Sequence, residues 1–207
     1  MNPLRSLGII TLLIGTTSGL TTGVSYATGS FNPSISALLE EENKFILLSN
    51  SDTEAWKESW EAYRQNNLGK QKDEWNIRNW SSSSEVPEEF KNICRQKATS
   101  KISNTSDPTY TAVTSYCTRP KTIKEIFEKE GMKLLGTDGN EKIWMDRFRE
   151  HFEYVDYFPI TNWDTNEDNF YRLIEGCKAV ANVQTTNINY DYLIILTEFL
   201  CLEKRKL

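Results

Sequence analysis

The chain has 207 residues, of which 38% are hydrophobic and 12% aromatic, enough to build one or two packed cores and too many for a disordered chain. Its formal net charge is -5, and acidic and basic residues are mixed throughout. Because binding to a phosphate backbone needs clustered Lys and Arg, this distribution excludes a nucleic-acid surface.

The first 27 residues have the pattern of an export segment. Arg5 precedes the apolar run from Leu7 to Ile14, and small residues end the segment at Ala27. This pattern predicts a signal peptide over residues 1–27 that is cleaved after Ala27. The alternative is an uncleaved membrane anchor over Leu7 to Val24, with the N-terminus held in the cytoplasm by Arg5. Both interpretations place the remaining chain outside the cytoplasm, either on the extracellular face of the membrane or secreted.

After a spacer at residues 28–33, the sequence predicts two helices. Ser34 is placed as an N-cap, and apolar residues then recur at helical spacing until Asn43, which suits the left-handed end of a helix. A polar turn follows, in which Ser51 and Glu54 are spaced for a capping box. The second helix has an aromatic face, which we expect to lie in a core. This face consists of Trp56, Trp60 and Tyr63.

Two more helices are predicted before residue 117. The polar segment 66–79, which separates them from the second helix, has the composition of a surface loop. Ser84 is the expected N-cap of the third helix, with Pro87 in its first turn. Asp107 is the expected cap of the fourth.

The pattern of residues 34–117 recurs at residues 122–201. The stretch from Ser34 matches that from Thr122 without a gap, and the match continues to the cysteines after one gap of five residues. The identical pairs are Ile35 with Ile123, Glu40 with Glu128, Glu42 with Glu130, Leu47 with Leu135, Trp56 with Trp144, Trp80 with Trp163, and Cys94 with Cys177. Self-similarity at a fixed offset predicts a tandem duplication of a small helical module, roughly 85 residues long, behind the N-terminal segment.

The second copy is expected to repeat the elements of the first. Trp144 and Phe148 continue the aromatic face, with His151 one turn further on. The expected caps and helix ends of this copy are Thr122 with Glu125, Gly131, Thr165 and Asp168.

The last element is the least certain part of the pattern. The stretch YDYLIILTEFLC at residues 190–201 is rich enough in aromatic and aliphatic residues to be a strand. We predict a helix, because a strand would need a partner that the module does not supply. The predicted fold class is therefore mainly α, with α+β as the alternative.

Four cysteines in an exported chain, without CxxC or Cys/His zinc spacing, indicate disulfides. If the two modules are copies, the natural pairs are Cys94 with Cys117 and Cys177 with Cys201, each within one module. The alternative is four buried free thiols.

The residues needed for familiar reaction centres are missing from the sequence pattern. His151 is the only histidine, and it lies on the aromatic face of a predicted helix. A Ser/His or Cys/His nucleophile pair, a transition-metal site and a Gly-rich phosphate loop therefore lack their parts. Acidic turns such as TDGNE at residues 137–141 lack the ligand spacing of a calcium loop. We predict no catalytic residue, no metal site and no cofactor.

Three stretches of the sequence resemble a known family. MNPLRSLG at residues 1–8, YCTRPKTIKEIFEKEGMKLL at 116–135 and WMDRF at 144–148 resemble the paralogous exported proteins of haemotropic mycoplasmas. The resemblance implies a wall-less, blood-cell-associated bacterium whose exported proteins face the host directly. It provides no catalytic residues for this chain, because that family has no assigned activity.

The sequence thus predicts an exported or membrane-anchored surface protein that is not an enzyme and serves as an interaction or antigenic module. The expected partner is a host cell-surface or serum protein, contacted through loops that differ between the copies, 66–79 and 153–162. Membrane contact is expected only through an uncleaved N-terminal segment. The alternatives are an exported hydrolase with a site between the two modules, and loops that have drifted without selection.

Overall fold

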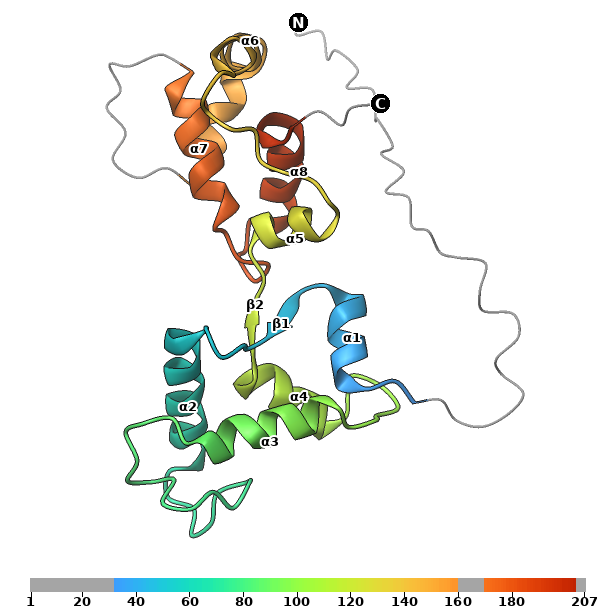
Figure 1. The fold of residues 1–207 in the computed structure, drawn as a ribbon, viewed down its shortest axis with the longest axis vertical. Coiled ribbons are helices and arrows are strands. Elements are labelled where there is room, and N and C mark those ends of the chain that lie inside the picture. The colour runs from blue at the N-terminus through green and yellow to red at the C-terminus, as the bar shows by residue number, and fades with distance from the viewer. Residues whose placement is uncertain (1–31, 160–169, 204–207) are drawn as a thin grey trace, which may run out of the picture. The chain divides into compact units, whose positions relative to one another are not determined.

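The computed structural model describes residues 32–159 and 170–203, which form a mainly helical protein (Figure 1). The elements in chain order are α1 (Ile35–Glu42), β1 (Phe45–Leu47), α2 (Thr53–Asn67), α3 (Glu88–Ala98), α4 (Pro108–Tyr116), β2 (Thr118–Pro120), α5 (Ile123–Lys129), α6 (Glu141–His151), the 3-10 helix η1 (Phe152–Tyr157), α7 (Tyr171–Ala181) and α8 (Tyr190–Cys201). β1 and β2 pair antiparallel, with Ile46 opposite Arg119. The prediction of a mainly helical fold is confirmed, and the segment that resembled a strand is helix α8.

Several sequence predictions concern residues outside the described ranges. These are the signal peptide or anchor at 1–27, cleavage after Ala27, most of the spacer at 28–33, and the caps at Thr165 and Asp168. In the part of the chain that the structure describes, no helix combines the length and the apolar character needed to cross a bilayer.

Local sequence signals set several helix ends as predicted. The Ser34 hydroxyl accepts a hydrogen bond from the Ala37 amide at the start of α1. Asn43 ends this helix in the left-handed conformation, with φ of 54°. Thr122 and Glu125 form the predicted capping box of α5. These ends follow from side-chain hydrogen bonds or backbone preferences that operate within one turn, so the sequence alone identifies them.

Two of the predicted caps are wrong. α2 begins after Asp52, so Ser51 and Glu54 form no capping box, and the Asp52 carboxylate instead accepts the Ser49 amide at 2.7 Å and closes the preceding turn. α3 begins after Pro87 without a side-chain cap from Ser84. Proline already holds the extended entry conformation at this position, so the helix starts there.

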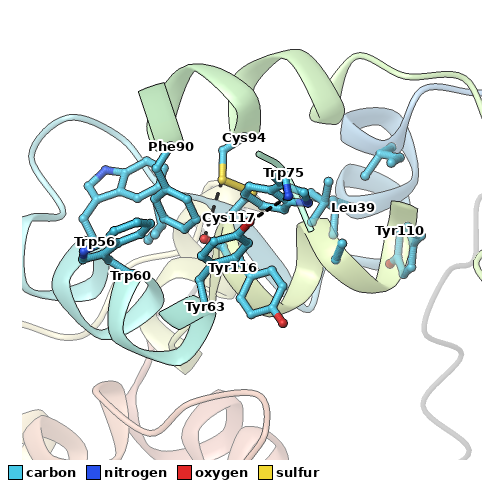
Figure 2. Packing of buried hydrophobic residues seen from close by; sticks show 14 of the residues in the cluster. Leu39, Trp56, Trp60, Tyr63, Trp75, Phe90, Cys94, Tyr110, Tyr116 and Cys117 are labelled. Atoms are coloured by element: carbon cyan, nitrogen blue, oxygen red, sulfur yellow. Dashed lines mark hydrogen bonds between the residues drawn. A yellow bond between two sulfur atoms is a disulfide. The ribbon is translucent and has the colours of Figure 1, made fainter. Parts of the chain in front are cut away.

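The first hydrophobic core is built on the aromatic face of α2 (Figure 2). Trp56, Trp60 and Tyr63 are all buried, as the sequence predicted. They surround Phe90 of α3, whose ring centroid lies 5.0 Å from that of Trp60 and 5.3 Å from that of Tyr63. Edge-to-face and tilted aromatic packing of this kind fixes α2 against α3.

Residues from the second half of segment 66–79 also enter this core, so the segment is only partly the surface loop that its composition predicted. Asp73, Trp75 and Ile77 are buried. The Tyr63 hydroxyl donates to the Asp73 carboxylate and accepts the Trp75 amide at 2.8 Å, while the Ile77 amide donates to Asp73 at 2.9 Å. These bonds satisfy the buried polar groups, so a polar sequence packs inside the protein.

The second core contains Trp144 of α6 and Leu173 of α7, together with residues from segment 153–162. Val155 and Phe158 of that segment are buried, so it too is only partly a surface loop. The ring of Phe158 lies directly over Gly176 of α7.

Replacing Gly176 by Ala is expected to lower the free energy of unfolding by about 1–2 kcal/mol. A Cβ at this position would lie 2.6 Å from a ring carbon of Phe158, and relieving such a clash costs more than the helix propensity that alanine gains. Urea denaturation measures the change. Gly136→Ala is the control, because a Cβ there makes only an ordinary contact. A Gly176 variant as stable as the control would contradict the packing described.

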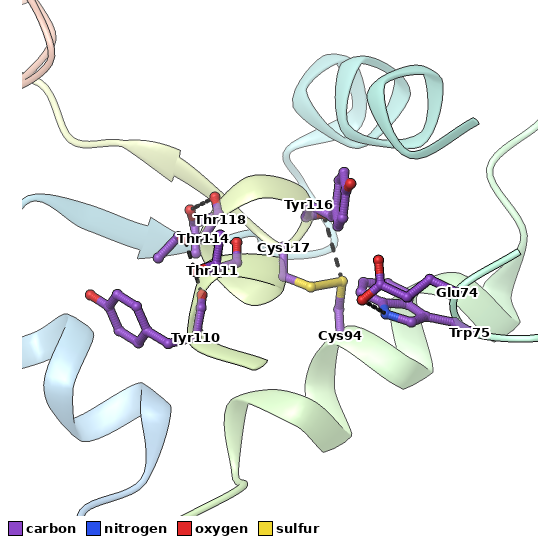
Figure 3. The surroundings of a disulfide bond; sticks show 9 residues. All are labelled: Glu74, Trp75, Cys94, Tyr110, Thr111, Thr114, Tyr116, Cys117 and Thr118. Carbon is purple, nitrogen blue, oxygen red and sulfur yellow. Dashed lines mark hydrogen bonds between the residues drawn. A yellow bond between two sulfur atoms is a disulfide. The ribbon is translucent and has the colours of Figure 1, made fainter. Parts of the chain in front are cut away.

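Both disulfides have the predicted pairing. Cys94 of α3 is bonded to Cys117, which follows α4, and Cys177 of α7 is bonded to Cys201 at the end of α8. Figure 3 shows the first bond between the two helices, next to Trp75. The alternative of four free thiols is wrong.

Two long-range hydrogen bonds and one local one of residues 34–117 have counterparts in residues 122–201. The pairs of bonds are Ile35 N to Ser100 O with Ile123 N to Val183 O, Leu48 N to Cys117 O with Leu135 N to Cys201 O, and Trp56 Nε1 to Ser49 O with Trp144 Nε1 to Gly136 O. They correct the ungapped match, because Leu135 takes the place of Leu48 and not of Leu47. One extra residue before the second helix restores the original match. Trp56 bonds to a carbonyl seven residues earlier in the chain, whereas Trp144 bonds to one eight residues earlier.

Candidate functional site

Helix α8 is apolar on the face that points away from the core. Tyr192, Ile195 and Phe199 are 44%, 61% and 58% exposed. Their spacing of three and four residues places them on one side of the helix. The opposite side is buried in the second core and consists of Leu193, Leu196, Thr197, Leu200 and Cys201. A helix on the surface of a core needs only one apolar side to fold. Folding therefore does not explain why the outer side of α8 is apolar as well.

Two rings from neighbouring elements extend this outer face. Tyr157, at the end of η1, is 60% exposed, and its ring centroid lies 5.6 Å from that of Tyr192. The His151 ring, at the end of α6, lies 4.6 Å from that of Phe199. We name the set of His151, Tyr157, Tyr192, Ile195 and Phe199 the α8 surface. His151 thus contacts an exposed ring of α8.

The end of α8 is held in place by a buried arginine as well as by a disulfide. Arg147 of α6 donates to the carbonyl oxygens of Leu200 at 2.7 Å and of Leu202 at 2.8 Å. Burial lowers the pKa of the Arg147 guanidinium. Sequence reasoning did not identify Arg147, although its position three residues after Trp144 places it on the buried side of α6. The α8 surface is therefore presented on a fixed helix.

Helix α4 gives a direct comparison for α8, because each helix leads to a bonded cysteine. The exposed residues of α4 are Pro108, Thr111 and Ser115, which precede Cys117 by nine, six and two residues. Thr111 is drawn in Figure 3. The same distances before Cys201 lead to Tyr192, Ile195 and Phe199. The outer face is thus small and mostly polar on α4 but large and apolar on α8. Because the inner faces of both helices are buried, core packing does not account for this difference.

Acidic side chains border the α8 surface. Asp191 and Glu198 lie on α8, and Glu150 and Glu153 flank His151; all four are exposed. No Lys or Arg of the described residues forms an ion pair with any of them. Glu150 faces only the imidazole of His151, at 3.8 Å. Within the described residues, the border therefore carries four carboxylates without a Lys or Arg ion-pair partner, which favours a negative electrostatic potential there.

A groove beside β1 and α5 is the second candidate site, and it is where the alternative function, a hydrolase, would have its active site. Most of the charged side chains that line this groove have ion-pair partners, some of them outside the groove. Lys129 pairs with Glu40 at 2.9 Å, and Arg119 pairs with Glu125 at 2.7 Å. The hydrogen bond from Arg119 lowers the pKa of the Glu125 carboxyl, whereas a general acid needs a raised one. This groove is therefore the weaker candidate.

The four cysteines named from the sequence serve as structural cross-links, and Ala27 lies outside the described residues. Within the described ranges, no cluster of three or more His, Cys, Asp or Glu side chains is arranged to hold a metal ion. No protein-family model, curated protein or solved structure matches the chain. The α8 surface was not foreseen; the signal for it was the excess of apolar residues at 190–201 over what one buried helix face requires.

Proposed function

We propose that this chain is an exported interaction protein without enzymatic activity and that its contact surface is the α8 surface. The observation that carries the proposal is the apolar outer face of α8, set against the small, mostly polar face at the same places on α4. Contiguous exposed apolar side chains with a polar border are typical of protein contact sites. Aromatic residues are also enriched where binding energy concentrates.

The two disulfides support the export part of the proposal. Such bonds persist in oxidising surroundings outside the cytoplasm. The export pattern of residues 1–27 and the resemblance to exported proteins of haemotropic mycoplasmas agree with this location. A host cell-surface or serum protein is accordingly the proposed partner, and the protein would be exposed to the host as an antigen.

We further propose that residues 34–117 and 122–201 are two copies of one module behind an N-terminal signal or anchor. The two matching pairs of long-range main-chain hydrogen bonds and the equivalent disulfides support duplication, because they connect corresponding elements over long sequence distances. In a duplicated framework the core residues are constrained by packing, and the outer faces are free to diverge. On this proposal, α8 has acquired a contact surface that α4 lacks.

On this proposal the α8 surface takes the contact role that the sequence analysis gave to the two loops. The inner parts of segments 66–79 and 153–162 are buried and therefore unavailable to a partner. Tyr157 is the exposed residue of these segments that adjoins the α8 surface.

Exchange of two residues tests the proposed function. The double variant Ile195→Thr/Phe199→Ser gives α8 the residues found on α4, and we expect it to keep its helical circular dichroism spectrum. Binding to intact blood cells or serum proteins should fall at least tenfold, because burying an Ile and a Phe side chain contributes about 1.5–3 kcal/mol each. Fluorescently labelled protein and flow cytometry measure this for cells.

The control is Thr111→Ile/Ser115→Phe, which adds the same side chains to α4. This variant keeps the native α8 surface, so its binding to blood cells or serum proteins should equal that of the native protein. Equal binding by the Ile195/Phe199 variant and the native protein would reject the α8 surface as the contact site. Absence of any binding by the native protein would reject the interaction function itself.

A further inference from the structure

We infer that the α8 surface binds a cationic amphipathic segment of a protein, with apolar side chains at its centre and Lys or Arg at its edges. This inference rests on the proposed function and adds the chemistry of the partner. It follows from the combination of an apolar face on the fixed helix α8 with an acidic border that no described Lys or Arg side chain pairs with.

The charges of the border determine which partner fits. Asp191 lies four residues before Ile195 on α8 and Glu198 lies three residues after it, so both carboxylates neighbour the apolar face. Glu150 and Glu153 lie next to the His151 end of the surface. A single exposed ion pair contributes little, but four carboxylates together attract a cationic partner and repel an anionic one.

The same charges disfavour two other occupants. An anionic membrane surface would be repelled by the acidic border, although aromatic residues otherwise suit a membrane interface. A second copy of this chain, docked symmetrically through the α8 surface, would place the Asp191 and Glu198 borders of both copies close together. A basic segment of a different protein meets no such repulsion.

The size of the surface limits the segment that it binds. Tyr192 and Phe199 are seven residues apart, which corresponds to roughly 10 Å along the helix. Tyr157 and His151 widen the surface beside these two residues, through ring contacts at 5.6 Å and 4.6 Å. A partner contact of about two helical turns, with apolar side chains three and four residues apart, would cover this length.

Titration calorimetry with a synthetic probe tests the inference. The probe is a Leu/Lys peptide of 18 residues with its leucines on one helical face, and the comparison peptide has Glu in place of every Lys. We expect the Leu/Lys peptide to bind at least tenfold more tightly. Its affinity should fall with added NaCl and should drop at least threefold in Asp191→Asn/Glu198→Gln.

Control measurements separate charge, apolar contact and the other occupants. Glu41→Gln/Glu58→Gln removes two exposed carboxylates of the first half, so it should leave the affinity for the peptide unchanged. Ile195→Thr/Phe199→Ser should abolish peptide binding. Vesicles of phosphatidylcholine with phosphatidylglycerol should not bind, and ultracentrifugation should show no self-association that depends on Ile195 and Phe199.

The possible failures are distinguishable. Equal binding of both peptides, or no binding of either, overturns the cationic partner. Binding to the anionic vesicles, or self-association lost in Ile195→Thr/Phe199→Ser, also overturns it. In each of these cases the proposed function is judged separately, by whether the same variant loses binding to host cells or serum proteins.

Discussion

Replacing Cys177 and Cys201 together by serine should lower the free energy of unfolding by about 3 kcal/mol. The bond closes a chain segment with a separation of 24 residues, and a cross-link of this span restricts the unfolded chain by that amount. It also joins α7 to the end of α8 inside the second core. Urea denaturation monitored by circular dichroism measures the change.

The matching variant Cys94→Ser/Cys117→Ser tests the same effect in the first core. Its loop has nearly the same span, so its loss of stability should be similar. A loss below about 1 kcal/mol in both double variants would contradict the entropic account. Thiols that react in the native, unreduced protein would contradict the pairing itself.

Replacing Arg147 by Met should lower the free energy of unfolding by about 2–4 kcal/mol. Methionine keeps much of the side-chain volume but donates no hydrogen bond, so the carbonyl groups of Leu200 and Leu202 lose their donors in a buried place. Each such loss costs about 1–3 kcal/mol. Because both carbonyls lie at the end of α8, the backbone amides at this end should exchange hydrogen faster in the Arg147 variant.

Arg149→Met is the matched control for this prediction. Arg149 is exposed on the same helix and only approaches Asp146, at 3.9 Å, so its loss should cost less than about 1 kcal/mol. Equal stability of the Arg147 and Arg149 variants would show that the buried guanidinium does not hold α8. The residue three positions after Trp56 in α2 is Ser59, so this arginine anchor is specific to the second half of the chain.

The sequence predicts those parts of the fold that depend on neighbouring residues. Ser34, Asn43 and Thr122 with Glu125 begin or end helices through hydrogen bonds or backbone preferences that operate within one turn. The cysteine pairs were also predictable, because the recurring sequence pattern favours one of the three possible connectivities. The exact correspondence of residues between the two halves could not be predicted. One half lacks a residue near Leu135 and gains one before Trp144, so the sequence distance between matching residues is the same on either side.

Features that depend on distant contacts could not be predicted. Asp73 lies in a polar segment, and its buried carboxylate accepts hydrogen bonds from the Tyr63 hydroxyl and from the Ile77 amide. Arg147 finds its acceptors more than fifty residues away. Hydrophobic pattern alone likewise does not show which apolar side of α8 lies inside, and only the packed structure distinguishes Ile195 from Leu196.

Site-specific photo-crosslinking tests the central claim, that the outer face of α8 is the contact surface, most directly. p-Benzoylphenylalanine is placed at position 195 in one variant and at position 111 in the other, and both are irradiated on intact blood cells and in serum. We predict an adduct of defined mass from position 195 and none above background from position 111. Equal adducts from both positions, or none from position 195 while the protein still binds, would contradict the account.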